Sequence, residues 1–287
     1  MKPTMKTWKA LWISAALFLI AFVACKKGDS VTGAETLKVY LTDGPADYDA
    51  VNIDITAVEA KVDSCAGHRG DDHHGDNDGD QDDHQRRHDD FGDWVSLSAT
   101  PGIYDVLKLR NGIDTLLASG TVNGTIRKIR ITLGTNNTVV KNGITYPLVI
   151  SNETANYLYV HLRNEHRHHD SASQVGVWVD FDISRSIVES NGIFYLKPSL
   201  RPFCDKNFAG LEGRVLPAAA DAIVKVYNST DTAIAIPNPD GRFRVRGLPE
   251  GTYSVLFDGN NGYADQTISN VVLQKGKTVH LNDVTLQ

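Results

Sequence analysis

Residues 37–63, LKVYLTDGPADYDAVNIDITAVEAKVD, decide the fold class of this chain. From Leu37 to Thr42 apolar and polar side chains alternate, which is the period-two pattern of a strand with one buried face. Gly44-Pro45 supplies a turn, and a second alternating run follows it. The apolar parity of that run shifts by one residue at Thr56-Ala57, which in an unbroken strand would turn the apolar side chains outward. We therefore predict a β-bulge at Thr56-Ala57.

Alternating segments and hairpin turns continue beyond this stretch. Asn142-Gly143 and Asn191-Gly192 each separate two short apolar runs, and Asn-Gly suits the positive φ angles of a type I′ turn. The runs 157–162 and 175–183 are predicted to pair with each other. No amphipathic helix is expected between residues 37 and 203. The sequence therefore predicts an all-β, immunoglobulin-like sandwich over residues 37–204.

A second unit is predicted after residue 209. Short apolar runs alternate there with turns at Asp240-Gly241 and Pro249-Glu250-Gly251. The alternation predicts a second β-sandwich over residues 210–287. It places four side chains of this stretch in the core: Phe243, Val245, Tyr253 and Val255.

The first 24 residues have the pattern of a signal peptide. Three lysines precede an apolar run, 10–23, which is shorter than the ~20 residues needed to span a bilayer. The run ends in FVAC, which resembles the lipobox of bacterial lipoproteins and implies lipidation of Cys25. The polar stretch 25–36 then serves as a tether. Because no aspartate follows Cys25, the segment resembles that of lipoproteins sorted to the outer membrane. Cleavage without lipidation and an ordinary buried helix are the alternatives.

Charge and motifs narrow the class of protein. The chain has 287 residues and a formal charge of −6, which becomes −9 without the three lysines of the signal peptide. Nucleic-acid binding depends on neutralising phosphates with Lys and Arg, so we expect no nucleic-acid partner. No G-x-S-x-G, P-loop or G-x-G-x-x-G motif is present, and catalysis has no support.

Nine of the ten histidines lie in or beside two loops that are rich in carboxylates. The first loop, 64–93, has no large apolar side chain between residues 66 and 90 and is expected to be disordered without metal. Imidazole with carboxylate suits Zn, Ni or Cu, whereas a run of aspartates suits Ca. The alternative is a solvated insertion without a ligand, since loops tolerate such insertions. The candidate metal ligands are His68, His73, His74, Asp76, Asp78, Asp80, His84, His88, His161, His166, His168 and His169.

Three aromatic side chains, Tyr157, Tyr159 and Trp178, are predicted on the outer face of one hairpin. A row of exposed aromatic rings can stack on sugar rings. The alternative is that neighbouring strands or the second unit cover these rings, since sandwiches bury much of their aromatic content. Asp180 and Asp182 share the face of Trp178 and are predicted to be solvated.

Two cysteines remain once Cys25 is lipidated. An exported protein lies where disulfides form, so Cys65 and Cys204 are a candidate bridge. Their spacing does not decide between a bridge and two free thiols.

Two groups of motifs resemble known families. LTDGPADYDAVNIDITAVE (41–59), YDVLKLRNG (104–112) and FDISRSIVE (181–189) resemble family 4382 of the domains of unknown function, found in lipoproteins of the Bacteroidota type. This resemblance implies no activity. DGRFRVRGLPEGTYSV (240–255) resembles the carboxypeptidase-regulatory-like or prealbumin-like sandwich, a carbohydrate-binding-like fold. Related adhesin modules form an isopeptide bond through a glutamate, but Gly247 stands at that position and no such bond is expected.

Together these observations predict a non-enzymatic lipoprotein of the bacterial envelope, anchored in the outer membrane and facing the periplasm or the cell surface. We expect a surface binding module for carbohydrate or another envelope ligand, with the membrane as a partner through the lipid anchor. Metal binding by the two histidine-rich loops is one alternative. A structural spacer or adhesion protein is another.

Overall fold

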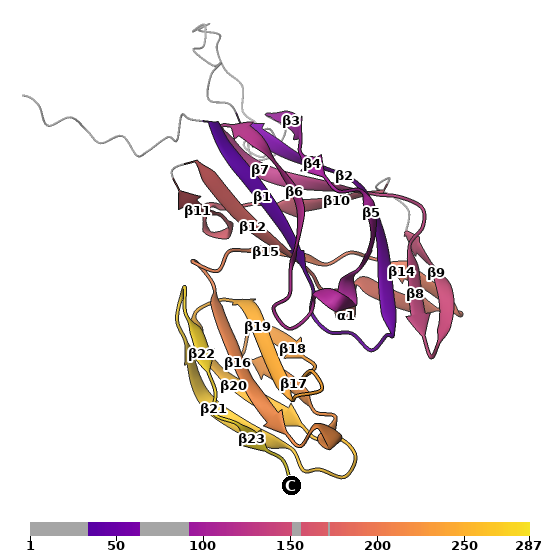
Figure 1. Ribbon diagram of the computed structural model, residues 1–287, viewed down its shortest axis with the longest axis vertical. Helices are drawn as coiled ribbons and strands as arrows, with labels where there is room; N and C mark the ends of the chain where they lie inside the picture. Colours follow the sequence, from indigo (N-terminus) through magenta and orange to yellow (C-terminus); the bar gives the residue numbers. More distant parts are fainter. Residues whose placement is uncertain (1–33, 64–91, 151–155, 172) are drawn as a thin grey trace, which may run out of the picture. The chain divides into compact units, whose positions relative to one another are not determined.

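The computed structural model describes residues 34–63, 92–150, 156–171 and 173–287, without the side chains of 168–171. It contains two hydrophobic cores. Figure 1 shows the strands that surround them. One core holds buried side chains from Leu37 to Leu196, and the other holds buried side chains from Ala209 to Leu286. The parts around these cores are termed the N-terminal and the C-terminal sandwich. Contacts join Gly33–Gln287 into one compact unit.

The N-terminal sandwich is built from two sheets. In the first sheet the strand order is β11-β12-β1-β6-β4, and β15 also pairs with β12. In the second sheet the order is β10-β7-β2-β8-β9-β14-β13, and β3 and β5 also pair with β2. The strands of the first sheet are β1 (Ala34–Thr42), β4 (Ser98–Ala99), β6 (Thr115–Asn123), β11 (His168–Ser171), β12 (Gln174–Phe181) and β15 (Leu200–Phe203). Those of the second are β2 (Ala50–Asp63), β3 (Asp93–Ser96), β5 (Gly102–Asp105), β7 (Thr125–Leu133), β8 (Thr138–Lys141), β9 (Ile144–Ile150), β10 (Tyr157–His161), β13 (Ile187–Ser190) and β14 (Ile193–Leu196).

The opening stretch folds as its alternation predicts. Leu37, Val39 and Leu41 of β1 are fully buried. In β2 the register against β7 shifts between Ile55 and Ala57, which confirms the predicted bulge. The apolar side chains on both sides of the bulge consequently point into the same core.

Both Asn-Gly hairpins are present. Asn142 and Gly143 join β8 to β9 with φ angles of 53° and 73°. Asn191 and Gly192 join β13 to β14 with φ angles of 52° and 74°. These positive φ angles are those of the type I′ turn that the Asn-Gly sequence favours.

The predicted pairing of runs 157–162 and 175–183 is wrong. β10 pairs with β7 in the second sheet, whereas β12 lies in the first sheet. There β12 pairs in parallel with β1, which places Leu37 opposite Val175. Alternation fixes which face of a strand is buried but does not fix its partner, and a connection of about a dozen residues also permits a crossover to the opposite sheet.

The C-terminal sandwich contains two four-stranded sheets, one in the order β19-β16-β22 with β23 paired to β16, the other in the order β18-β17-β20-β21. As predicted, Phe243 and Tyr253 are buried in its core. Its strands are β16 (Ala209–Leu216), β17 (Ile223–Tyr227), β18 (Thr232–Ala235), β19 (Arg242–Leu248), β20 (Gly251–Asp258), β21 (Gln266–Leu273), β22 (Thr278–His280) and β23 (Val284–Thr285).

Helical segments are short throughout the described residues. They are η1 (Val106–Leu109), η2 (Asn164–His166), α1 (Ile183–Ser186) and η3 (Ala218–Ala220). The predicted all-β fold class is confirmed. Within the ranges that the structure describes, no helix has the length and apolar character needed to cross a membrane.

Candidate functional site

Two of the three predicted aromatic residues lie together on the outer face of β10. The side chains of Tyr157 and Tyr159 are 38% and 43% exposed, and their ring centroids are 6.3 Å apart. Trp178 is in the other sheet, where it stacks on Tyr40 at 4.8 Å with an interplanar angle of 12°. Its indole N–H also donates a hydrogen bond of 2.7 Å to Asp114. Trp178 therefore does not share a surface with the two tyrosines.

Trp94 takes the place that the alternation pattern assigned to Trp178. It lies in β3, and its ring centroid is 6.1 Å from that of Tyr159. The signal for Trp94 was present in the sequence, since alternation with the buried Leu97 directs Trp94 away from the core. Trp94, Tyr157 and Tyr159 together are termed the aromatic face.

Arg130 of β7 binds between the rings of the aromatic face. Its guanidinium carbon is 4.2 Å from the ring centroid of Trp94 and 4.9 Å from that of Tyr157. Both distances fall within the range of a cation–π contact. A carboxylate oxygen of Glu59 is 2.6 Å from Arg130. This ion pair fixes the guanidinium on the sheet, and the guanidinium in turn limits the motion of the rings.

A groove of about 490 Å³ runs beside the two tyrosines. Besides Tyr157 and Tyr159, its lining includes Ile150, Pro198 and Leu200. The aromatic face therefore borders a concave surface rather than standing alone on a flat sheet.

The predicted metal ligands are only partly within the described residues. His161 is exposed at the end of β10. His166 is half-buried in η2, where its Nδ1 accepts a hydrogen bond of 3.1 Å from the Arg163 N–H and its ring stacks on Phe208. Burial lowers the pKa of His166. Among the described residues, no group of three or more His, Cys, Asp or Glu side chains is arranged to hold a metal ion.

The remaining predicted ligands are not placed. His168 and His169 belong to β11, whose side chains are not described. The others, His68, His73, His74, Asp76, Asp78, Asp80, His84 and His88, lie outside the described residues. Metal binding by the two loops stays a prediction.

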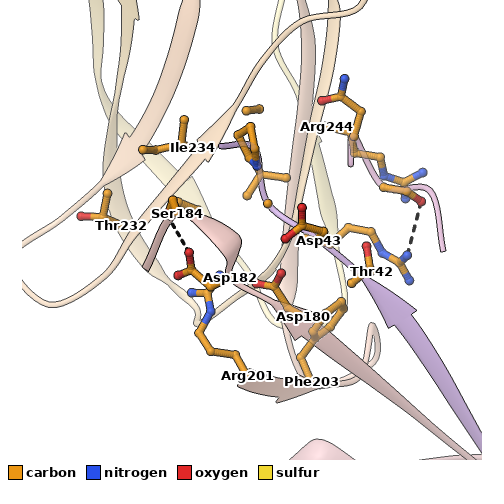
Figure 2. Close-up of a pocket in the computed structure, with 18 of the residues that line it drawn as sticks. Thr42, Asp43, Asp180, Asp182, Ser184, Arg201, Phe203, Thr232, Ile234 and Arg244 are labelled. Carbon is orange, nitrogen blue, oxygen red and sulfur yellow. Dashed lines mark hydrogen bonds and ion pairs between the residues drawn. The ribbon is translucent and has the colours of Figure 1, made fainter. Parts of the chain in front are cut away.

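Asp180 and Asp182 are buried, so the prediction that they are solvated is wrong. Their exposed fractions are 8% and 9%, and Asp43 at the end of β1 lies beside them at 6% (Figure 2). The guanidinium of Arg201 is 2.6 Å from Asp180, and the Ser184 hydroxyl donates a hydrogen bond of 2.6 Å to Asp182. The sequence pattern missed this cluster because the side of β12 opposite the core is covered by other parts of the chain.

Asp43 is the least compensated of the three carboxyls. The Ile183 N–H donates a hydrogen bond of 3.3 Å to its Oδ1. Burial, reinforced by the nearby charge of Asp180, raises the pKa of Asp43 to about 9. Asp43 consequently keeps its proton at neutral pH.

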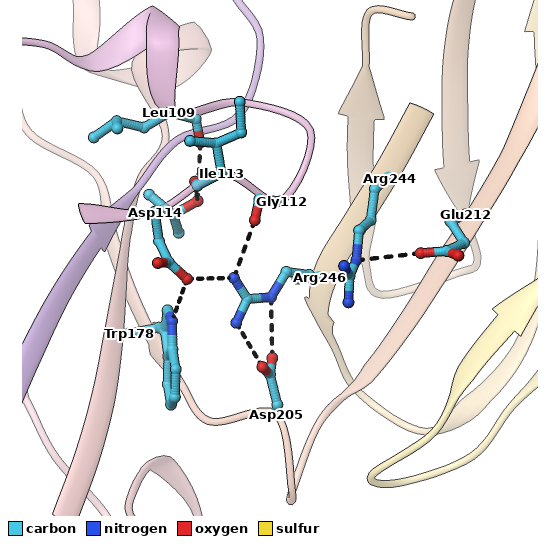
Figure 3. A network of polar contacts seen from close by, with 10 residues as sticks. Leu109, Gly112, Ile113, Asp114, Trp178, Asp205, Glu212, Arg244 and Arg246 are labelled. Carbon is cyan, nitrogen blue, oxygen red and sulfur yellow. Dashed lines mark hydrogen bonds and ion pairs between the residues drawn. The ribbon is translucent and has the colours of Figure 1, made fainter. Parts of the chain in front are cut away.

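Arg246 of β19 forms a buried network with residues of the N-terminal sandwich (Figure 3). Its guanidinium donates a hydrogen bond of 2.8 Å to Asp114 and forms a pair of hydrogen bonds, of 3.1 and 2.5 Å, with Asp205. The guanidinium carbon also lies 5.3 Å from the ring centroid of Trp178. This explains why Trp178 is unavailable as a sugar platform, since its face packs on Tyr40 and its edge holds the carboxylate that binds Arg246.

Gly247, the residue after Arg246, has a φ of +73°. A Cβ atom at this position would lie 2.9 Å from the ring of Phe203. A residue with a side chain is therefore disfavoured both by the backbone conformation and by Phe203.

Cys204 is fully buried and has no disulfide partner among the described residues. Its Sγ–H donates a hydrogen bond of 3.2 Å to the carbonyl of Glu165. Burial raises the pKa of this thiol. Cys65, its candidate partner, and Cys25, the candidate lipidation site, lie outside the described residues.

Structural comparisons give only weak similarities. A type II cohesin–X-dockerin complex of Acetivibrio cellulolyticus matches at 21% identity and a TM-score of 0.23, covering 27% of this chain and 56% of that chain. A minor pilin of Streptococcus agalactiae matches at 11% identity and 0.21, with 88% and 96% covered. The shaft pilin SpaA of Lactobacillus rhamnosus GG matches at 10% identity and 0.21, with 88% and 98% covered. At these scores the similarities carry no conclusion about function.

The family comparisons are more decisive. A comparison with curated proteins finds no match. The profile of the carboxypeptidase regulatory-like domain matches residues 210–287, and that of a domain of unknown function, DUF4382, matches residues 34–198. Both resemblances noted in the sequence are thereby confirmed, in the predicted order. Because the second match spans 165 of the 287 residues, more than half of the chain, the chain belongs to the DUF4382 family.

Proposed function

We propose that this protein is a non-enzymatic binding protein of the bacterial envelope, and that its N-terminal sandwich binds carbohydrate through the aromatic face. The observation that carries the proposal is the gathering of Trp94, Tyr157 and Tyr159 from two distant strands onto one exposed sheet surface. Sugar rings present apolar C–H faces, and aromatic rings at such a surface stack on them.

The construction of the face supports this role. The rings project from strands whose backbone is fixed by pairing, and a site on rigid strands is more precise than a site on loops. Arg130 lies between two of the rings and offers hydrogen-bond donors beside them. The face therefore combines apolar stacking surface with polar groups that suit sugar hydroxyls, as binding sites for small ligands commonly do.

The envelope location rests on the N-terminal sequence. Three lysines, a short apolar run and Cys25 after a small residue form the pattern of a lipoprotein signal peptide. Mass spectrometry of the membrane fraction tests this directly. We expect a diacylglycerol-modified Cys25 at the mature N-terminus, and an unmodified N-terminus at another residue would contradict it.

A glycan array followed by isothermal titration of the purified mature protein tests the binding proposal. For a glycan that binds, we expect Trp94→Ala or Tyr159→Ala to weaken binding about tenfold, which corresponds to the loss of one aromatic contact. Tyr227→Ala is the matched control, because Tyr227 also carries a cation, Lys225, at 5.4 Å but belongs to the C-terminal sandwich. Unchanged affinity in both face variants would overturn the proposal.

A second candidate function is that of a rigid spacer, and the network around Arg246 favours it. The side chain of Arg246 is only 9% exposed and is held by carboxylates on two sides. Such a buried, fully paired contact restricts motion between two modules, whereas open interfaces between domains allow motion by default. Small-angle scattering of the mature protein tests this role, and we expect one narrow distance distribution that broadens in Arg246→Ala.

A further inference from the structure

The buried carboxyls of Asp43, Asp180 and Asp182 line a cavity of about 80 Å³ (Figure 2). Its lining comes from both sandwiches and includes Asp43, Asp180 and Thr232. By the same measure of volume, one water molecule needs about 10–15 Å³. The cavity therefore has room for a ligand of several non-hydrogen atoms.

Three buried polar atoms without a hydrogen-bond partner gather in the lining of this cavity. They are Asp43 Oδ2, Asn111 Oδ1 and Arg201 Nε. Buried polar atoms in folded proteins nearly always have partners, since each unpaired one costs about 1–3 kcal/mol. Asp43 itself has an exposed fraction of only 6%, so its free oxygen has little contact with bulk solvent.

The other atoms of these three side chains are fixed. Asn111 Nδ2 donates a hydrogen bond of 2.8 Å to the carbonyl of Ile236, so its Oδ1 cannot exchange places with Nδ2 without losing that bond. Arg201 Nη2 is held 2.6 Å from Asp180. Because Asp43 is protonated and its Oδ1 accepts the Ile183 N–H, its Oδ2 carries the proton. The lining therefore holds two donors, Asp43 Oδ2–H and Arg201 Nε–H, and one acceptor, Asn111 Oδ1, in a preorganised arrangement.

The charges around the cavity decide the class of ligand. Four guanidinium groups line it, those of Arg185, Arg201, Arg244 and Arg246, and they disfavour a metal ion. The carboxyls of Asp180 and Asp182 line it as well, and their pairing with Arg201 and Arg185 disfavours an anion. A hydroxyl group is neutral and both donates and accepts, so hydroxyls can satisfy the two donors and the acceptor at once.

We propose that this cavity is a binding site for a neutral polyhydroxylated ligand, a single sugar unit or a small polyol, held by Asp43, Asn111 and Arg201. The cavity borders β1, β15 and β18, whereas the aromatic face belongs to β3 and β10 of the opposite sheet. The inference therefore stands independently of binding at the aromatic face.

Isothermal titration of the mature protein with glucose, galactose, mannose, xylose and myo-inositol tests the inference. Glucuronate, glucosamine and calcium chloride serve as charged probes. We expect saturable binding of at least one neutral compound, weakened at least tenfold in Asp43→Leu, which is close in size to Asp43 but has no hydrogen-bonding group. Asp240→Asn, a change on an exposed turn, should leave the affinity unchanged.

Two further measurements separate binding in this cavity from binding elsewhere on the protein. Thr232→Trp should block the cavity from the C-terminal sandwich and abolish binding even if Asp43→Leu disturbs folding. Trp94→Ala should bind the same compound normally. Loss of binding in Trp94→Ala would assign the ligand to the aromatic face and overturn the inference, as would binding of charged probes alone or of no neutral compound at tens of millimolar.

Discussion

Arg246 donates a hydrogen bond of 2.8 Å to Asp114, a residue 132 positions earlier in the chain. The same carboxylate oxygen, Asp114 Oδ2, accepts the indole N–H of Trp178 at 2.7 Å. One carboxylate therefore joins a strand of each sandwich, and the C-terminal sandwich provides the cation that neutralises it. Removing Arg246 leaves the half-buried carboxylate of Asp114 without its cation, and removing Asp114 leaves the buried guanidinium of Arg246 with one carboxylate fewer.

We expect Arg246→Ala to destabilise the protein by about 1–3 kcal/mol, because it removes the hydrogen bonds to Asp114 and Asp205. Differential scanning calorimetry should show a single transition in the wild type and two transitions in the variant. Arg244→Ala is the control. Arg244 is 43% exposed and pairs with Glu212 within the C-terminal sandwich, so its loss should cost less than about 1 kcal/mol.

Asp43 makes stability depend on pH. Its pKa is about 9 in the folded protein against an ordinary value of 3.8, because it is buried beside Asp180. Between these two pH values the folded state holds one more proton than the unfolded state, so raising the pH favours unfolding. We expect urea denaturation to show stability falling from pH 5 to pH 9.

Asp43→Asn is the matched variant for this pH dependence, since it has no proton to lose. Its stability should fall less over the same range, and the difference between variant and wild type should grow with pH. The neighbouring Asp180, whose pKa is also raised by burial, should keep part of the slope in the variant. Identical slopes in the two proteins would contradict the assignment to Asp43.

Gly247 and Gly143 test the contact with Phe203. Both have a φ of +73°, but a Cβ at Gly143 meets no atom within 4 Å. Gly143→Ala should therefore cost only the left-handed backbone strain, about 1–2 kcal/mol. Gly247→Ala should cost about 1–3 kcal/mol more, because the ring of Phe203 must move. Equal losses in thermal denaturation would show that Phe203 yields freely.

The buried thiol of Cys204 should resist alkylation. In a chain that begins at residue 26 and carries Cys65→Ser, Cys204 is the only cysteine. We expect N-ethylmaleimide to add no mass to the folded protein and one adduct in concentrated urea, because the thiol is fully buried. With Cys65 present and no reductant, two adducts in urea would show free thiols, and none would show the bridge.

Much of the fold could be predicted from local pattern. The bulge after Ile55 was visible because parity is a strict property of a strand, and the two Asn-Gly hairpins because few other sequences adopt their φ angles. The partner of β12 was not visible. Its pairing with β1 joins Leu37 to Val175, and nothing in either strand distinguishes that partner from β10.

The candidate site residues could likewise be predicted where local alternation decides their environment, and not where the strand partner decides it. Tyr157 and Tyr159 were recognised because alternation turns them outward. Trp178 was misassigned because its environment is decided by Tyr40 and Asp114, which arrive from other strands. Asp180 was misassigned for the same reason, since Arg201 compensates its burial through the pairing of β12 with β15. The environments of Trp178 and Asp180 both depend on long-range strand pairing, which a local sequence pattern does not encode.

The central position of β1 has a consequence for the order of events in folding. β1 is the first strand of the described chain, yet it lies between β6 and β12 in its sheet. It cannot pair with β12 until the chain from residue 174 onward has been synthesised. Until then one long edge of an apolar strand stays open to association with other chains. Pairing over such sequence distances is slow, so we expect refolding yield to fall steeply with protein concentration.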